Sequence, residues 1–180
     1  RLFGKLIPHE RYPLSLGVTF DKCLNFKKHV DNLRAKCIKR LNFLKLVAHS
    51  SWQLNRATLI SIYKSLIGSV LDYSSFMLPA LSSSLKAKLQ AVQNSAMRVI
   101  FRRTKLEHTS TAELCAMSGL DLVEKRMNDL NSRYFKRAVA NNNELIANLF
   151  GEYKKDMVGA GIGKKTLLCG HIEVFEPLER

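Results

Sequence analysis

The sequence predicts a mainly α-helical protein that begins with a short β-hairpin and ends in a loose tail. Three observations support this fold class. Apolar residues recur at steps of three and four over long stretches, as they do along the buried side of a helix. The first 20 residues instead hold two β-type runs around a proline-containing link. The hydrophobic fraction of 46% in 180 residues is enough for the core of one ordinary domain.

The β-type runs are Leu2–Ile7 and Leu14–Phe20, and the polar link between them carries Pro8 and Pro13. Two prolines in so short a segment fit a hairpin or loop and exclude a helix. Gly17 lies inside the second run, where it indicates a bulge or the close approach of another backbone. We therefore assign residues 1–21 to a β-hairpin.

A long first helix follows, with a single apolar stripe and basic residues on every other side. The stripe consists of Phe26, Val30, Leu33, Cys37, Leu41, Leu44 and Ala48. At 100° per residue, the basic residues are Lys27, Arg34 and Lys45 on one flank, Lys36 and Arg40 on the other, and Lys28 and Lys39 opposite the stripe. The solvent-facing surface of this helix is therefore expected to be cationic.

The second helix is predicted over Arg56–Leu78, with Asn55 as its N-cap and Pro79 as its end. It is apolar around most of its circumference, which is typical of a central core helix. The third helix is predicted from Ser82–Ser84 to about Arg103. Its stripe is Leu85, Leu89, Val92, Ala96 and Val99, and its basic residues are Lys86, Lys88, Arg98, Arg102 and Arg103.

These three helices make residues 22–106 a basic three-helix bundle, and residues 107–151 are expected to form accessory helices. Ser110 and Glu113 have the spacing of a capping box for a helix that Gly119 ends. Asp121 and Glu124 repeat that spacing before a helix that a run of three asparagines breaks at residue 141. Residues 152–180 are predicted to be a loose tail, with a short strand at 165–169 or 172–175.

The positive charge is concentrated in one segment. The net charge is +14, and residues 22–106 contain 16 lysines and arginines against two acids, Asp31 and Asp72, whereas the rest of the chain is balanced. Ordinary helix surfaces mix both signs, because acids support Lys and Arg one turn away. The alternative of a plain solvated surface is therefore weaker than phosphate binding by this segment. Phe26, Phe43, Trp52 and Phe101 could stack on bases, but their positions at or beside apolar stripes favour the core.

No catalytic or metal centre is indicated. Asp72 lies among apolar residues, so it is either a metal ligand or, as we expect without a second carboxylate nearby, a salt-bridge anchor or cap. His29, Cys23 and Asp31 could form a nucleophile site, but the pattern favours a surface histidine in a basic patch. Residues 159–166 resemble a phosphate loop, but Val158 stands where that motif needs Gly, and Lys165 where it needs Ser or Thr.

The four cysteines form no CxxC pair, and Cys169 with His171 lacks a second ligand pair for zinc. We expect buried thiols in a reducing compartment. No secretory signal and no membrane-spanning apolar run is visible, so we expect an intracellular protein, in the nucleus or cytoplasm, with no membrane partner. The chain starts with Arg1 rather than Met, and we expect it to be a piece of a longer protein.

Several phrases, in order, resemble the end of the reverse-transcriptase region of non-LTR (LINE-type, jockey-like) retrotransposons. Leu14–Asp21 is similar to the family's YLGVTFD, and Leu24–Val30 to its LTFKKHI. The remaining matches are Ile62–Ile67, Val70–Tyr73, Leu89–Ile100, which resembles LQxxQNKAxRxI, and Leu130–Phe135. Together they cover roughly residues 13–150.

The resemblance implies that the hairpin is a primer grip, with Leu16 and Gly17 beside the primer strand, and that the helices form a thumb. The basic side chains would then contact an RNA–DNA, RNA or DNA duplex, next to the palm and fingers of the parent polymerase. The family's catalytic Asp-Asp motif precedes the Leu-Gly segment, so we expect no catalysis and no cofactor in this chain, and Mg²⁺ only in the parent. The two alternatives are a basic helical module for an acidic protein and an inactive, degenerate element fragment.

Overall fold

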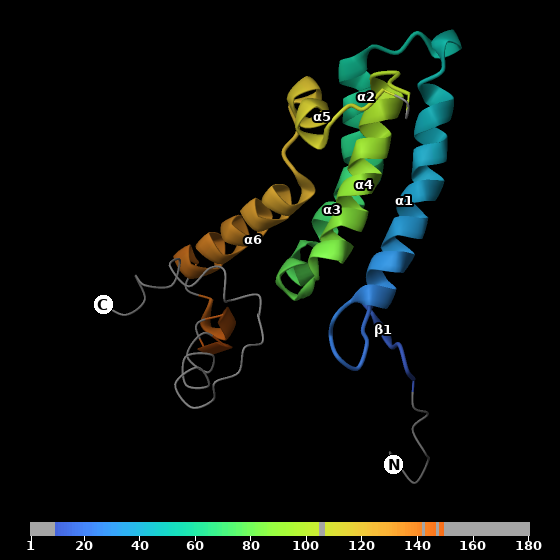
Figure 1. Ribbon diagram of the computed structural model, residues 1–180. Helices are drawn as coiled ribbons and strands as arrows, with labels where there is room; N and C mark the ends of the chain where they lie inside the picture. Colours follow the sequence, from blue (N-terminus) through green and yellow to red (C-terminus); the bar gives the residue numbers. More distant parts are fainter. Residues whose placement is uncertain (1–9, 105–106, 142, 147, 150–180) are drawn as a thin grey trace.

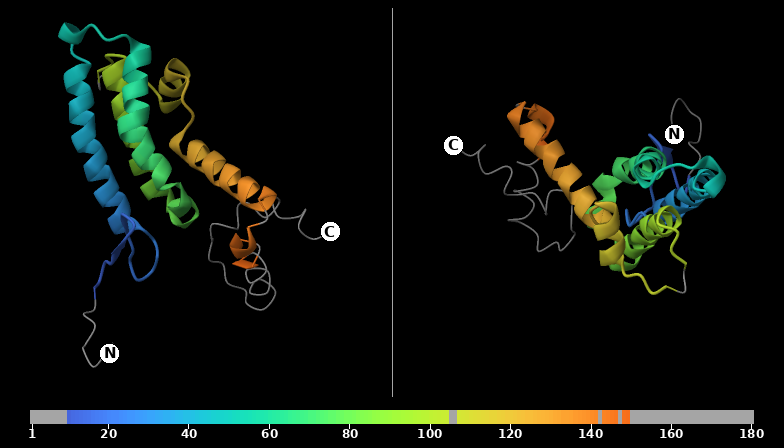
Figure 2. Two further views of the ribbon diagram at one scale, coloured as in Figure 1. Left: turned by 180° about the vertical axis from the view of Figure 1, so that it is seen from behind. Right: turned by 90° about the horizontal axis from the view of Figure 1, so that it is seen from above.

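Three helical segments run side by side in alternating directions, which confirms the predicted bundle (Figures 1 and 2). In this computed structural model, which describes residues 10–104, 107–141, 143–146 and 148–149, α1 spans Lys27–Val47 and α4 spans Ser83–Ile100. The return segment between them begins with α2, Arg56–Tyr63, after a short 3-10 turn, η1, at Ser50–Trp52. Consequently α1 and α4 are parallel to each other.

Two further helices pack on the side of the bundle away from α1 (Figure 2). They are α5, Thr111–Ser118, and α6, Val123–Ala140. Leu114 and Met127 are fully buried in the same hydrophobic cluster as the buried side of α1. The accessory helices therefore complete the core of the bundle.

The predicted stripe of the first helix is confirmed. Its members from Phe26 to Leu44 are buried, and Ala48 is half-buried against the core. The stripe of α4 is confirmed except at Val99, which is only half-buried, while Met97 and Ile100 beside it are buried. Gln93 is also buried on this side of α4.

The hairpin is smaller than predicted and lies entirely inside the second β-type run. β1, Leu14–Ser15, pairs antiparallel with β2, Val18–Thr19, so the expectation of one strand over Leu14–Phe20 is wrong. Leu16 and Gly17 form the two-residue turn with φ of 47° and 79°, both positive as a type I′ turn requires. Gly17 therefore serves the turn and makes no bulge, and the first predicted run, Leu2–Ile7, lies outside the described residues.

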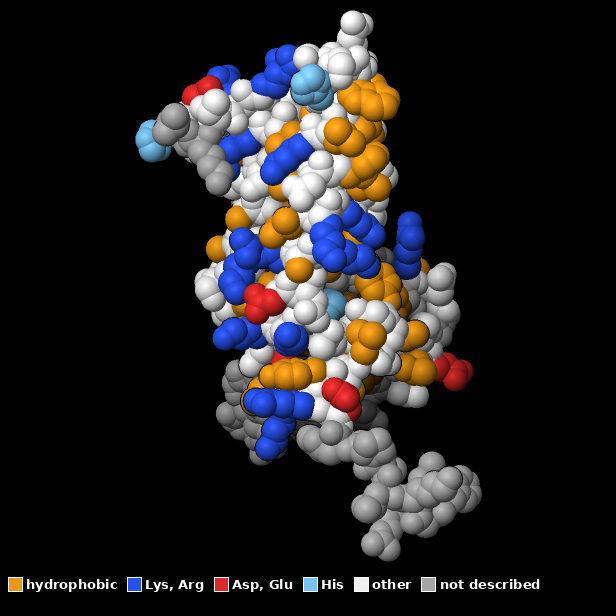
Figure 3. Space-filling model, turned by 90° about the vertical axis from the view of Figure 1, so that its right-hand side faces the viewer, with side chains coloured by type: hydrophobic (Ala, Val, Ile, Leu, Met, Phe, Trp, Pro, Cys, Tyr) orange, Lys and Arg blue, Asp and Glu red, His pale blue; other side chains and the backbone are white. Residues whose placement is uncertain are grey.

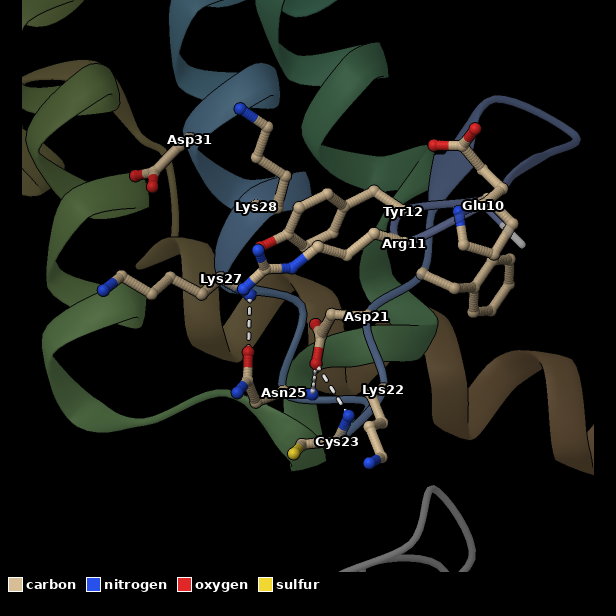
Figure 4. A pocket seen from close by; sticks show the side chains of 12 residues that line it. Glu10, Arg11, Tyr12, Asp21, Lys22, Cys23, Asn25, Lys27, Lys28 and Asp31 are labelled. Carbon is tan, nitrogen blue, oxygen red and sulfur yellow. Dashed lines mark hydrogen bonds between the residues drawn. The ribbon is translucent and has the colours of Figure 1, made fainter. Parts of the chain in front are cut away.

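The loop between the hairpin and α1 is organised by one carboxylate. Asp21 accepts backbone N–H bonds from Cys23 at 3.1 Å and Asn25 at 3.2 Å (Figure 4), and a third from Phe26 at 2.7 Å. Phe26, the N-cap of α1, has a left-handed backbone and offers no side-chain cap. Asp21 therefore satisfies amide groups that lead into the helix, a role that its position in the sequence did not indicate.

His29 joins the hairpin to two helices, so its prediction as a surface residue is wrong. Its side chain is buried, Nδ1 accepts the backbone N–H of Thr19 at 3.2 Å, and Nε2 lies 3.4 Å from Ser74 Oγ. Because Nδ1 accepts, the proton belongs on Nε2 and is donated to Ser74. The position lies beside the apolar stripe of α1, and the hairpin covers it.

The predicted second helix is not continuous. Asn55 caps α2 as expected, with its side chain accepting the N–H of Thr58 at 2.8 Å. The helix then widens into a π-helical turn, η2, over Lys64–Gly68, continues as α3 over Ser69–Tyr73 and tightens into the 3-10 segment η3, Ser75–Ala80.

Pro79 does not end η3 but lies inside it. Proline has no N–H, so within the 3-10 segment it cannot donate to the carbonyl of Phe76, three residues earlier. Asn131 of α6 donates its Nδ2–H to the carbonyl of Ser75 at 3.0 Å. This bond ties the proline-containing segment to a distant helix.

The two predicted capping boxes have different outcomes. Ser110 and Glu113 form one at the start of α5, and Gly119 ends that helix with a left-handed backbone, both as predicted. The second box is wrong, because α6 starts at Val123, whose N–H donates to Gln90 Oε1 of α4 at 2.9 Å. Asp121 instead binds Lys125 at 2.7 Å. The end of α6 at Ala140, where the asparagines begin, is confirmed.

A buried polar chain crosses the core between three elements. The Tyr63 hydroxyl donates to Gln93 Oε1 at 2.9 Å, and Gln93 Nε2 donates to the backbone carbonyl of Asp121 at 2.9 Å. Tyr63 and Gln93 are both buried, and burial raises the pKa of Tyr63 well above its ordinary value. The chain thus connects α2, α4 and the segment before α6 without an ion.

Replacing Gln93 by Leu should destabilise the protein, because it leaves the buried Tyr63 hydroxyl without an acceptor. We expect the free energy of unfolding, measured by urea denaturation, to fall by about 2 kcal/mol. The double variant Tyr63→Phe/Gln93→Leu removes both partners and should lose less than Gln93→Leu alone. A double variant that loses as much as the sum of the two single variants would contradict this account.

Protonation of His29 should destabilise the fold. Burial lowers the pKa of His29 below its ordinary value of 6.5, so the unfolded chain takes up a proton before the folded one as the pH falls. This contribution to stability is complete above about pH 6.5 and is lost progressively below it. Urea midpoints at about pH 7.5 and about pH 5.5 should therefore differ more in the wild type than in His29→Gln. An equal pH dependence in both proteins would refute the assignment.

Candidate nucleic-acid interface

The outward side of α1 is the candidate interface. Six of its cationic side chains are exposed and make no ion pair within the described residues: Lys27, Lys28, Arg34, Lys36, Lys39 and Lys45. At 1.5 Å per residue, they extend over about 27 Å of helix. Figure 3 faces this side of the molecule, where blue side chains are spread along its length and red ones are few. The structure therefore brings together the first-helix residues that the sequence predicted.

One acid lies on this helix, and it is engaged by α4. Asp31 Oδ1 accepts a hydrogen bond from Lys88 Nζ at 2.9 Å. This bond holds the pKa of Asp31 below its ordinary range, so the carboxylate stays ionised and neutralises Lys88. Lys88 belongs to the predicted set, but it is less available to an outside anion than the six open cations.

Other predicted residues are also engaged within the protein. Lys86 pairs with Glu124 of α6 at 2.8 Å, and Arg103 pairs with Glu107 at 3.0 Å. Arg98 donates to the carbonyl of Thr109 at 3.2 Å. Arg102 is exposed just beyond the end of α4, with a positive φ of 53°. The described basic residues of α4 and of the segment after it, Arg102 excepted, are therefore engaged within the protein, unlike the six open cations of α1.

The hairpin turn lies against α3 and borders the same hollow as Lys36 and Arg40 of α1. The Tyr73 hydroxyl donates to the backbone carbonyl of Leu16 at 2.6 Å, and a Cβ on Gly17 would lie 4.0 Å from the Tyr73 ring. Leu16 itself is 86% exposed, which leaves its side chain open to a neighbouring molecule. The tyrosine thus fixes the turn that the resemblance places beside the primer strand.

Two hollows adjoin α1, and they differ in charge. The larger, of about 910 Å³, is lined by acids as well as cations, including Glu10, Asp21 and Lys27 (Figure 4). The smaller, of about 370 Å³, lies between the hairpin, α1 and α3 and has no acid in its lining. Its cations are Lys36 and Arg40, and the guanidinium of Arg40 also donates to the carbonyl of Leu66 in the π-helical turn.

The aromatic predictions hold for two residues of four. Phe26 and Phe101 are buried, as expected, but Phe43 and Trp52 are 52% and 58% exposed. Phe43 lies on α1 away from the stripe, and Trp52 lies in the turn beyond its end, so neither reaches the core. A further aromatic residue that the sequence did not single out, Tyr73, is 62% exposed beside the hairpin turn.

A second basic surface was also missed. The last part of α6 carries three exposed cations, Arg133, Lys136 and Arg137, with no acid after Asp129 in that helix. Outside residues 22–106 the net charge is zero, so composition did not indicate these three cations. The absence of acids near them was nevertheless visible in the sequence. They lie across the bundle from α1 (Figure 2).

The residues considered for catalysis have structural partners. Asp72 accepts two bonds from Arg126 of α6, at 3.2 Å from Nε and 2.9 Å from Nη2, which confirms the predicted salt-bridge anchor. Cys23, His29 and Asp31 form no nucleophile site, since His29 and Asp31 are bound elsewhere. In the part of the chain that the structure describes, no three His, Cys, Asp or Glu residues are grouped to hold a metal ion.

The cysteine prediction is partly wrong. Cys37 is buried and burial raises the pKa of its thiol, but Cys23 is exposed and Cys115 is half-buried. The described cysteines are free thiols. The phosphate-loop candidate at 159–166, the pair Cys169 and His171, and the predicted tail strands lie outside the described residues.

Comparison with protein-family models, with curated proteins and with solved structures finds no match to this chain. Among the described residues, no helix has the length and apolar character needed to cross a bilayer.

Proposed function

We propose that the chain binds a nucleic-acid duplex through its phosphates, as the thumb-like part of a non-LTR retrotransposon reverse transcriptase. One observation carries the proposal: six open cations follow the outward side of α1, and its single acid is already paired with Lys88. Lysine and arginine bind phosphates by displacing condensed counterions, which gives affinity without reading the sequence. Cations spread over about 27 Å of one helix can contact several phosphates of a duplex at once.

The order of elements supports the thumb assignment. A hairpin with Leu16 and Gly17 at its turn is followed directly by the helical bundle, which is the order that the resemblance implies for a primer grip and thumb. Tyr73 ties the turn to α3, and His29 of α1 accepts the N–H of Thr19 in β2, so the hairpin and the cationic helix are held in a fixed relation. In this proposal the template–primer duplex is the partner, and upstream palm and fingers supply the Mg²⁺-dependent chemistry.

A protein partner is the second candidate, favoured by exposed apolar residues near the end of α1. Phe43, Leu46 and Trp52 are each more than half exposed. Aromatic residues are enriched in protein interfaces, and a basic rim around them would suit an acidic protein. The same aromatic side chains could instead stack on unpaired bases, so competition has to separate the two functions.

Neutralising the outward side of α1 should weaken duplex binding and reduce its dependence on salt. For Lys27→Gln/Arg34→Gln/Lys45→Gln, the slope of log K against log salt should become shallower by about 2 to 3, since each lost phosphate contact contributes about 0.9. Fluorescence anisotropy with a labelled RNA–DNA duplex measures this slope over a range of KCl concentrations. All three positions are exposed, so the variant should fold as the wild type does.

The matched control is Arg133→Gln/Lys136→Gln/Arg137→Gln on α6, which removes the same charge from the other side of the bundle. It should leave the slope nearly unchanged. Equal losses in both triple variants would show that net charge, and not the surface of α1, governs binding. Salt-independent binding, or preferential binding of polyglutamate in competition with the duplex, would favour the protein-partner candidate.

A further inference from the structure

The hollow between the hairpin, α1 and α3 is lined by two cations and by no acid. Its lining comes from three elements that are distant in sequence, including Gly17 of the turn, Lys36 and Arg40 of α1, and Ser69 and Tyr73 of α3. Lys36 and Arg40 are one helical turn apart, so both side chains project from the same flank of α1. Two like charges are thus held in one concave site that no carboxylate neutralises.

The free hydrogen-bonding capacity of this hollow is concentrated on these cations. Tyr73 donates to Leu16, Ser69 to the carbonyl of Ser65, and Asn32 to Thr19 Oγ1, so these groups are engaged within the protein. His29 is also engaged, between Thr19 and Ser74. The side chain of Lys36 makes no hydrogen bond or ion pair with any described residue.

Arg40 is oriented toward the site by the π-helical turn. One of its Nη atoms donates to the carbonyl of Leu66, which fixes the planar guanidinium and leaves its other N–H groups available. A guanidinium held in this way loses little further side-chain entropy when it binds an anion. The hollow therefore has a fixed arginine and an open lysine, a pair that suits the tetrahedral oxygens of a phosphate.

From this arrangement we infer that the hollow is a specific phosphate site, which receives one backbone phosphate of a bound nucleic-acid strand. The inference rests on the proposed function for the source of the phosphate. It adds one phosphate contact at a defined position to a surface whose other cations attract phosphates without a defined site. The volume of about 370 Å³ has room for the phosphate and its attached sugar. The exposed ring of Tyr73 at the edge offers a stacking surface for the adjoining base.

The test uses the full chain and two probes, inorganic phosphate and the labelled RNA–DNA duplex. At constant ionic strength, inorganic phosphate should shift the backbone amide NMR signals of Gly17, Ser69 and Tyr73 in a saturable manner. Lys36→Glu should weaken this binding by about tenfold or more, because it puts a carboxylate into the site. Lys64→Glu makes the same change of charge on η2, outside the hollow, and should stay within about twofold of the wild type in near-physiological salt.

The results decide between the inference and its alternatives. Unsaturated or scattered shifts in the wild type, or equal weakening by the two variants, would overturn the phosphate site. Loss of phosphate binding in Lys36→Glu, with duplex affinity no lower than in Lys64→Glu, would overturn the nucleic-acid source and point to a free phosphate compound. Failure of the proposed function has a different signature: phosphate binds at the hollow, yet the duplex does not bind, or binds independently of salt.

Discussion

Burial of the apolar stripe of α1 makes it possible to hold seven cations on one helix. Like charges one turn apart, such as Lys36 and Arg40, destabilise an isolated helix by a few tenths of a kcal/mol per pair. Six members of the stripe between Phe26 and Leu44 are buried, and burying even one such side chain contributes about 1.5 to 3 kcal/mol. Packing against α2, α3 and α4 therefore stabilises this segment as a helix. Its outward side can then carry a charge pattern that would destabilise the same helix in isolation.

A second principle of this fold is that side chains of one element bond backbone groups of another where the helices are irregular or begin. Asn131 bonds the carbonyl of Ser75 in η3, Arg40 bonds a carbonyl of the π-helical turn, and Gln90 accepts the first N–H of α6. Each irregularity therefore fixes the position of a neighbouring helix. Because a buried unpaired amide or carbonyl is costly, these bonds also make the arrangement specific.

Local pattern predicted those features that depend on neighbours in sequence. The stripe of α1, the Asn55 cap, the capping box of α5 and the break at Asn141 all follow from residues within one or two turns. A salt bridge from Asp72 to a basic residue was predicted, but the identity of that residue was not, because Arg126 lies 54 positions away. His29, Pro79 and Asp121 were predicted wrongly, since the hairpin, α6 and α4 respectively determine their environments, and no local signal reports those contacts.

In the candidate interface too, local features could be predicted from the sequence, whereas features that depend on distant contacts could not. The charge of α1 was evident from composition, but the neutralisation of Lys86 by Glu124 and of Lys88 by Asp31 depends on how the helices are placed. The hollow beside Tyr73 could not be predicted, because it exists only where the turn of the hairpin meets two helices.

The parallel course of α1 and α4 has an electrostatic consequence of its own. The aligned peptide units of a helix leave about half a positive charge at its amino end, and both of these amino ends lie at the hairpin end of the bundle. The interrupted segment from α2 to η3 opposes them, so a net macrodipole remains along the bundle axis. An approaching polyanion would therefore meet, besides the basic helix, an added positive potential at the hairpin end of the bundle, which favours its first contact there.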